Sequence, residues 1–223
     1  MDRPLGPDLP GFASAARPSR EPLRGAYVEL RPVDPSADAE PLFEASRDPG
    51  IWTYLFDGPY SSIDEFRVML EQAALLEDPF RYTIVREGDP EGMCSYLRIT
   101  PEHGVIEIGN IWFGTPMQRT TAATEAIYLL ALNAFDTLGY RRLEWKCNAL
   151  NGPSRRAAER FGFRFEGVFE QHMVVKGHNR DTAWYAIVDH EWPAVRAGFE
   201  AWLQASNFDA GGHQLRTLEQ CRA

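Results

Sequence analysis

The segment 105–149 most constrains the fold, because it reads as a strand, a helix and a second strand in succession. VIEIGNIWF, at 105–113, and RRLEWKCNA, at 141–149, are runs of strand length. Between them, apolar residues recur at helical spacing over 125–138, and Gly139 follows as a stop signal. A strand that leads through a helix to another strand of the same sheet forms a parallel pair. The sequence therefore predicts at least one parallel strand pair.

Patterns on both sides of this segment predict one mixed sheet. Alternation and turn signals predict strands at 26–33, 80–87 and 93–100, and a closing hairpin whose strands, 163–175 and 181–192, are joined by KGHNR. The short turns GDPEG and PEHG make 80–113 an antiparallel meander. Helical periodicity and capping residues predict helices at 38–46, at 61–76, within 151–162 and at 192–203. We expect an α/β fold with a mixed, strongly twisted central sheet of about seven strands and helices on both faces.

The chain divides into one domain and two flanking segments. Its 223 residues are 44% hydrophobic and 25% charged, which is ordinary for a globular protein with one core. Residues 1–22 are rich in Pro and lack periodicity, so we expect a flexible or loosely docked arm. We expect the domain at 23–203 and a polar C-terminal tail at 204–223.

Charge and cysteine usage exclude several classes of protein. The formal net charge of -9 argues against a nucleic-acid partner, which needs accumulated Lys and Arg. Cys94, Cys147 and Cys221 show neither CxxC nor Cys/His ligand spacing, which predicts reduced thiols in a cytoplasmic protein and no metal site. We expect no signal peptide and no membrane span, because no run approaches the roughly 18 apolar residues that a span needs.

The stretch GTPMQRTTAATEA, at 114–126, lies where the strand hands over to the crossover helix. The first backbone N–H groups of a helix lack intrahelical partners, and the helix dipole favours an anion there. Small or polar residues occupy this position, but the glycine patterns of a Walker loop and of a dinucleotide fingerprint are both missing. The stretch is typical either of a pyrophosphate site or of a simple helix cap.

Two separated motifs resemble those of the GCN5-related N-acetyltransferase (GNAT) family. QRTTAA, at 118–123, is similar to the family's acyl-CoA motif Q/R-x-x-G-x-G/A, with Thr121 in place of the central glycine. NGPSRRAAERFGF, at 151–163, is similar to the second signature of Asn-x-x-Ser, a helix and Gly-Phe. FEGVF and KGHNRDTAWYAI resemble the ribosomal-protein N-terminal acetyltransferase (RimJ/RimL-like) branch. The resemblance covers about 23–192 and implies a GNAT fold with acetyl-CoA as acyl donor.

The resemblance implies where acetyl-CoA binds. Its pyrophosphate would lie on the loop and helix start formed by Gln118, Arg119, Thr120, Thr121, Ala122, Ala123 and Thr124. Thr121 either bonds the phosphate with its hydroxyl or marks a loosened site. The strand 105–113 would splay from 143–149, and the pantetheine arm would pair with the backbone of Ile111, Trp112 and Phe113. Asn151 and Ser154 would lie near the pantetheine and the thiol.

Catalytic roles follow less directly from the sequence. Glu107 is our first choice of general base for the amine, and the alternative is an outward-facing residue in ordinary strand alternation. Ser154 either protonates the departing thiolate or is a polar first-turn residue, and Asn151 is also a good helix cap. Ala158 stands where many family members carry a tyrosine acid.

Four other ionisable residues have ordinary structural explanations. Glu102 and His103 are expected to be solvated turn residues, and His172 either faces the cleft or is structural. Asp181 matches an acidic position of the branch, or closes a turn by pairing with Arg180 or Arg142.

The segment IWTYLFDGPYSS, at 51–62, concentrates aromatic side chains before the helix at 61–76. It carries Trp52, Tyr54, Phe56 and Tyr60. In the family this region borders the acceptor site. The aromatic side chains form either a lid over the acceptor or ordinary packing.

The resulting hypothesis is an acetyl-CoA-dependent N-acetyltransferase that acts by direct attack in a ternary complex. Its acceptor is a primary amine, either a small molecule or a protein N-terminus. We expect a monomer or homodimer with neither a nucleic-acid nor a membrane partner. The alternatives are a non-catalytic CoA-binding or regulatory protein with the same fold, and an unrelated α/β binding module.

Overall fold

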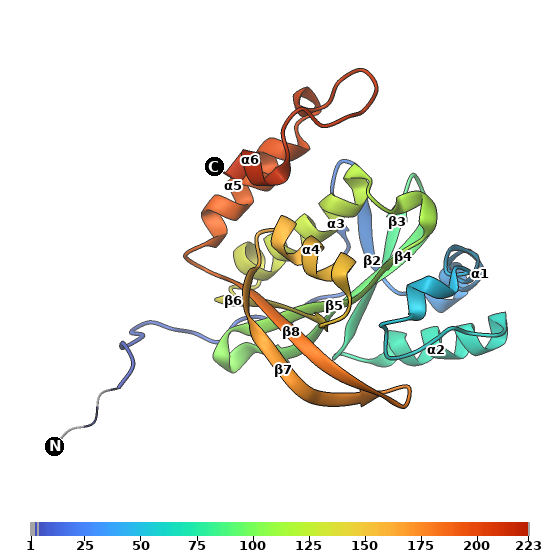
Figure 1. The fold of residues 1–223 in the computed structure, drawn as a ribbon, viewed down its shortest axis with the longest axis horizontal. Helices are drawn as coiled ribbons and strands as arrows, with labels where there is room; N and C mark the ends of the chain where they lie inside the picture. The colour runs from blue at the N-terminus through green and yellow to red at the C-terminus, as the bar shows by residue number, and fades with distance from the viewer. Residues whose placement is uncertain (1–2, 4, 223) are drawn as a thin grey trace.

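Eight strands form one open sheet in the computed structural model, which describes residue 3 and residues 5–222 (Figure 1). The order across the sheet is β1-β2-β3-β4-β5-β6-β8-β7. The strands are β1 (Leu23–Arg24), β2 (Glu29–Pro32), β3 (Phe80–Arg86), β4 (Asp89–Thr100), β5 (Val105–Phe113), β6 (Arg142–Asn148), β7 (Arg164–Val175) and β8 (His178–Val188). Only β5 and β6 pair in parallel among these strands. The predicted mixed sheet and parallel pair are confirmed, and the strand beyond the expected seven is the two-residue β1.

Helices cover both faces of the sheet, as predicted (Figure 1). One face carries α1 (Pro35–Ala45) and α2 (Ile63–Leu75), and the other carries α3 (Thr121–Leu132) and α4 (Gly152–Arg160). Next to α3 lies α5 (Trp192–Leu203), against which the short α6 (Leu218–Arg222) packs.

Capping residues determine where the first two helices begin. The Asp34 carboxylate accepts hydrogen bonds from the backbone of Ser36 and Ala37, so α1 begins before the predicted residue 38. At α2, Ser62 accepts from the backbone of Glu65, as the cap pattern predicts. The boundary error at α1 reflects a cap followed directly by Pro35, which suits the first helical position.

Two hairpin turns are shorter than the sequence suggested. GDPEG was expected to be a loop, yet β4 already begins at Asp89. Glu87 and Gly88 form the whole turn with φ of 54° and 95°. Lys176 and Gly177 likewise join β7 to β8 with φ of 51° and 77°. Two residues with positive φ match the twist of the flanking strands, so pairing continues up to the turn.

The crossover helix starts earlier than the predicted residue 125. Helix α3 begins at Thr121, because the Thr120 side chain accepts a hydrogen bond of 3.2 Å from the Ala123 backbone. The helix then passes into a wider turn at Asn133–Thr137. The loop that carries QRTTAA and the start of α3 therefore form one continuous, capped segment.

Both flanking segments contact the domain. In the N-terminal arm, the backbone N–H groups of Ala15 and Ala16 donate to Pro101 and Leu138. Residues 204–222, which we expected to be a polar tail, fold back onto α5. Leu218 is fully buried there, and the Arg222 guanidinium donates to the Arg160 carbonyl.

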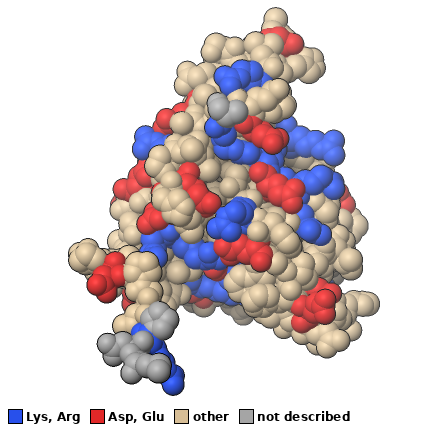
Figure 2. All heavy atoms as spheres, turned by 60° about the vertical axis from the view of Figure 1, so that its left-hand side comes forward, with Lys and Arg blue, Asp and Glu red and all other residues tan. Residues whose placement is uncertain are grey.

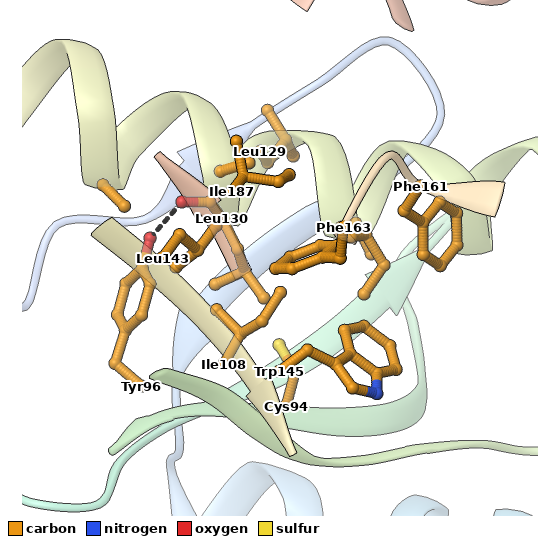
Figure 3. Packing of buried hydrophobic residues seen from close by; sticks show 14 of the residues in the cluster. Cys94, Tyr96, Ile108, Leu129, Leu130, Leu143, Trp145, Phe161, Phe163 and Ile187 are labelled. Carbon is orange, nitrogen blue, oxygen red and sulfur yellow. Dashed lines mark hydrogen bonds between the residues drawn. The ribbon is translucent and has the colours of Figure 1, made fainter. Parts of the chain in front are cut away.

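The main core fixes the centre of the sheet against α3 (Figure 3). Ile108, Leu143 and Ile187, from three neighbouring strands, are fully buried beneath Leu129 and Leu130. The Tyr96 hydroxyl donates a hydrogen bond of 2.5 Å to the Leu130 carbonyl. A second cluster packs α1 and α2 on the opposite face. This packing fixes the end of β5 relative to the start of α3.

Candidate active site

A cleft of 1030 Å³ opens where β5 and β6 separate. The two strands pair only as far as Ile108 and Trp145, although both continue beyond that point. A register shift against β4 accompanies Asn110, whose φ is 49°. Such a bulge bends its strand away from a neighbour. The predicted splay is confirmed, and Ile111, Trp112 and Phe113 all line the cleft.

The start of α3 forms one end of the cleft. Gln118 to Thr121, Ala123 and Thr124 line it, whereas Ala122 is buried and borders a separate hollow of 580 Å³. Within the described chain, the backbone N–H groups of Arg119, Thr121 and Ala122 donate to no protein acceptor. Arg119 adopts φ of 63°, and the Gln118 side chain donates to the Phe113 carbonyl. Unpaired N–H groups at a helix start suit an anion.

Arg160 lies at the same end and was missed by the sequence analysis. Its guanidinium donates to the Thr124 hydroxyl at 3.1 Å and lies 4.9 Å from the centre of a Trp202 ring. Burial lowers the pKa of Arg160, and the nearby Arg222 charge lowers it further. Trp202 and Gln214, joined by a 2.8 Å hydrogen bond, also line this end. Folding of the C-terminal segment, which no local pattern indicates, brings these groups together.

The second signature forms another wall of the cleft. Asn151 caps α4, as predicted, by accepting from the Ser154 backbone at 3.1 Å. The Ser154 oxygen accepts a 3.0 Å hydrogen bond from the Trp145 indole, so its own hydrogen points elsewhere, and the Cys147 thiol is an acceptor within its reach. Ala158, at the position of the family tyrosine, is fully buried and presents no side chain to the cleft.

Cys147, predicted only as a reduced thiol, also lines the cleft. Burial raises the pKa of Cys147, and a hydrogen bond from Ser154 only partly opposes this effect. A thiol that stays protonated is a poor nucleophile. The site therefore does not favour an acyl-cysteine intermediate.

Glu107 is buried in the cleft wall with 3% of its surface exposed, which excludes the outward-facing alternative. Its Oε2 atom forms ion pairs with the Arg98 guanidinium at 2.5 Å and with the Lys146 ammonium at 2.9 Å. Lys146 also pairs with Glu144 at 2.6 Å. The other Glu107 oxygen, Oε1, accepts no hydrogen bond in the described part of the chain. The sequence analysis missed both cations, because pairing across three strands has no local signature.

Asp181 and His172 have different environments. Asp181 is partly exposed and accepts hydrogen bonds from the Gln171 backbone and the Asn179 side chain, which lower its pKa. The salt bridge considered for it with Arg180 or Arg142 is absent among the described residues. His172 lines the cleft, with Nδ1 2.9 Å from the Thr182 hydroxyl.

The two remaining candidates, Glu102 and His103, do not line the cleft, and neither does Arg142. Glu102 and His103 are solvent-exposed turn residues, as expected. Arg142 instead pairs with Glu144 and Glu166.

The aromatic segment divides between the core and the cleft. Trp52 is buried, with its ring centre 5.3 Å from Tyr60 and 5.8 Å from Trp112, which is ordinary core packing. Tyr54 and Phe56 instead line the cleft. Trp52 and Tyr60 therefore pack in the core, and Tyr54 and Phe56 line the cleft.

Two contacts tie this segment across the cleft. The Tyr54 hydroxyl donates to the Leu150 carbonyl at 3.3 Å. The Lys176 ammonium, in the β7–β8 turn, donates to the carbonyls of Trp52 and Asp57 at 2.8 Å each. These contacts hold Tyr54 and Phe56 over one end of the cleft.

Surface and sequence-wide features add three observations. Basic and acidic side chains are interspersed on the face shown in Figure 2. No helix within the described residues has the length and apolarity to cross a membrane. Across the same residues, no group of three His, Cys, Asp or Glu side chains is placed to hold a metal ion.

Comparisons with known proteins agree on one family. The model of an acetyltransferase (GNAT) domain matches residues 28–164. The crystal structure of a GCN5-related N-acetyltransferase from Brucella melitensis aligns with a TM-score of 0.94 and 45% identity, covering 96% of this chain and 99% of its own. The protein named uncharacterized N-acetyltransferase p20, from Bacillus licheniformis, is 26% identical over 160 residues, which are 70% of this chain and 89% of that protein.

The branch suggested by the sequence has weaker support. The structure of RimL, a ribosomal L7/L12 alpha-N-protein acetyltransferase in complex with coenzyme A, aligns with a TM-score of 0.67 and 24% identity. It covers 77% of this chain and 99% of its own. At this identity the likeness shows a shared fold alone.

Proposed function

This chain is an N-acetyltransferase of the GNAT family, and from that premise we propose that it transfers an acetyl group from acetyl-CoA to a primary amine within a ternary complex. The observation that carries the proposal is the single cleft that joins the start of α3, the free edge of β5 and the second signature. An anion site, an unpaired strand edge and a polar wall are what a phosphorylated, amide-containing thioester needs.

Acetyl-CoA binding is assigned to the residues predicted for it. The pyrophosphate would accept hydrogen bonds from the unpaired N–H groups of Arg119, Thr121 and Ala122. The Arg160 guanidinium adds positive charge at that end. The pantetheine arm would fill the gap beside β5, where Ile111 to Phe113 lack a β6 partner. The unpaired N–H groups at the start of α3 and the unpaired edge of β5 both support this assignment.

The reaction would proceed by direct attack. The amine nitrogen forms a bond to the thioester carbonyl carbon, and the carbon–sulfur bond then breaks. Backbone N–H groups near Ile111 to Phe113 would stabilise the developing oxyanion, because fixed donors in a sheltered site cost no reorganisation. The amine loses its proton to a base, and the thiolate receives one from an acid.

Glu107 remains our proposed base, acting directly or through water. Its Oε2 atom is held by two cations, and its Oε1 atom is the one left without a protein partner in the described chain. Ser154 is the proposed acid, supported by its acceptance of the Trp145 indole hydrogen. A direct path is further supported by the raised pKa of Cys147, which disfavours a covalent alternative.

Several finer predictions stay predictions. The acceptor is a small amine or a protein N-terminus, and the ribosomal-protein branch is one hypothesis for it. The cytoplasmic location, the absence of a metal and the monomeric or dimeric state also remain expectations from the sequence.

The deciding experiment measures thiol release from acetyl-CoA with a panel of amines, alongside the melting temperature with and without acetyl-CoA. We expect a saturable rise in melting temperature and amine-dependent thiol release. Stabilisation without release for any amine would favour the non-catalytic alternative. A protein that neither binds nor is stabilised by acetyl-CoA would sink the proposal.

A further inference from the structure

Arg180, on β8, is a buried cation that has no anionic partner among the residues the structure describes. It is 6% exposed and lines the cleft, and its Nε atom is buried without a hydrogen-bond acceptor. The neighbouring Asp181 is engaged elsewhere. Among the ion pairs of the described residues, none includes Arg180, whereas buried Lys146 has two.

An unpaired buried charge is costly, so this arrangement needs an explanation. Burial lowers the pKa of Arg180, which expresses the same cost. The Phe56 ring, 4.6 Å from the guanidinium carbon, offsets part of it through a cation–π contact. The ring offers no acceptor to the N–H groups at the edge of the guanidinium, so those donors still lack acceptors. These donors are suited to an anion that arrives with a ligand.

The charges around Arg180 leave a local excess of positive charge. Its charged neighbours are Glu107 and Arg98, and the neutral thiol of Cys147 lies nearby. Glu107 already neutralises Arg98 and shares Lys146 with Glu144. This part of the cleft therefore favours an anion, although the whole chain carries a net charge of -9.

Arg180 lies on the acceptor side of the proposed reaction. It is three residues from the β7–β8 turn, which lies far from α5 and α6 in Figure 1. Its stacking partner Phe56 belongs to the segment held across the cleft by Tyr54 and Lys176. Those two ties hold the segment across this end, and a segment fixed there favours a small acceptor over a polypeptide.

We infer that the acceptor is a small primary amine that also carries a carboxylate, and that Arg180 binds this carboxylate. The inference rests on the proposed acetyltransferase function and names its substrate class. A planar guanidinium offers two parallel N–H donors that match the two oxygens of a carboxylate. Phe56 would hold the guanidinium plane, and Glu107 would lie on the same side of the cleft to receive the amine proton.

The test compares matched acceptors in the full-length protein. Free α-, β- and γ-amino acids are each paired with their carboxamide, which has nearly the same shape but no negative charge. Aminophosphonates test whether another anion substitutes, and unblocked tripeptides test the polypeptide alternative. We expect at least one amino acid to exceed its carboxamide in kcat/KM by roughly 10- to 100-fold, the range for hydrogen bonds to a charged group.

Two substitutions assign this preference to Arg180. Arg180→Met should reduce the ratio to near one while the carboxamide rate changes little, and Arg180→Lys should keep part of it. Arg164→Met is the matched control, because Arg164 is a half-exposed arginine outside the cleft. It should leave the ratio unchanged.

The inference would be overturned by carboxamides used as well as acids, by an Arg180→Met variant that keeps the preference, or by tripeptides used better than any amino acid. A preference for aminophosphonates over every amino acid would replace carboxylate by phosphonate and also overturn it. These results leave amine acetylation itself intact.

A binding measurement covers the case in which no amine reacts. N-acetylated amino acids should raise the melting temperature of the wild-type CoA complex but not that of Arg180→Met. Equal effects on both proteins would overturn the inference. Failure of acetyl-CoA itself to bind would instead count against the proposed function.

Discussion

Glu107 and Lys146 form a buried ion pair across the parallel strands β5 and β6, with 2.9 Å between Oε2 and Nζ and side chains 3% and 4% exposed. The pair lies where the two strands begin to separate, since their pairing ends at Ile108 and Trp145. Lys146 also contacts Glu144 and lies 3.9 Å from the centre of the Trp184 ring. A buried charge network therefore forms the inner wall of the cleft.

Lys146→Met should destabilise the protein strongly, because it leaves two buried carboxylates without this partner. Removing one member of a buried pair typically costs about 3–5 kcal/mol in the free energy of unfolding. Urea unfolding measures the change. Arg164→Met, which breaks half-exposed pairs, should cost about 1 kcal/mol or less. Equal effects of the two substitutions would contradict a special role for the buried network.

Glu107→Gln should lower kcat, while acetyl-CoA affinity stays unchanged. Glutamine keeps the shape of the side chain but cannot accept the amine proton. The matched control is Glu144→Gln, which loses a carboxylate that also holds Lys146 but does not line the cleft. Steady-state kinetics of both variants with a saturating amine, beside calorimetric titration with acetyl-CoA, would separate them. A wild-type kcat in Glu107→Gln removes Glu107 from the mechanism.

Ser154→Ala should lower kcat with little change in acetyl-CoA affinity, if its hydroxyl protonates the thiolate. General acids contribute roughly 100-fold or more to such steps. Ser154→Thr keeps the hydroxyl and should retain most of the activity. An alanine variant with wild-type kcat would show that Ser154 is only a first-turn helix residue that accepts from Trp145.

Thr121→Val should weaken acetyl-CoA binding by about tenfold, the effect of losing one hydrogen bond to a charged group. The Thr121 hydroxyl lines the cleft and makes no hydrogen bond within the described chain, so it is available to a phosphate oxygen. Valine keeps the shape, and Thr121→Ser restores the hydroxyl and should restore affinity. Calorimetric titration with acetyl-CoA measures all three. Equal affinities for Val and Ser would mean that the family glycine was replaced without a new contact.

Low pH should lower the free energy of unfolding partly through protonation of Glu166. Hydrogen bonds from Arg142 hold the pKa of Glu166 below its ordinary value of 4.5. The unfolded chain then binds the proton more readily, so this stabilisation is complete above pH 4.5 and is lost as pH falls through the lower folded pKa. Urea unfolding between pH 3 and 7 should therefore give a flatter curve for Glu166→Gln.

The control for this measurement is Glu170→Gln, since Glu170 makes neither an ion pair nor a side-chain hydrogen bond in the part of the chain described. Its curve should run parallel to that of the wild type. A Glu166→Gln curve that also runs parallel would contradict the assignment to Arg142 and Glu166.

Local patterns predicted the elements well where hydrogen bonds stay within a few residues. Strand β5 and helix α5 have the predicted ends, and Asn151 caps α4 as expected. The prediction was wrong by four residues at α3, because Thr120 caps a stretch of small residues that shows no apolar periodicity. The turn expected over GDPEG is shorter than predicted, because Glu87 adopts a positive φ that its residue type does not indicate and β4 already begins at Asp89.

The residues of the candidate site also fall into two groups, those predicted from local motifs and those defined by contacts between distant segments. The α3 loop and the second signature are contiguous segments, so their residues were identified by number from the sequence. Arg98, Lys146, Arg160 and Arg180 were not predicted as cleft residues, because each acts through contacts with distant segments. Glu107 was identified as a candidate, but its burial and its two cation partners were not foreseen.

The sequence by itself determined the mixed sheet, the parallel crossover and the two signatures, because periodicity, caps and turn residues act over short distances along the chain. Only the tertiary structure decided which charges face the cleft and which find partners. Pairing and burial depend on distances through space, and Arg180 is a surplus cation only because its neighbours Glu107 and Asp181 are already engaged. That relationship, rather than either signature, carries our inference about the acceptor.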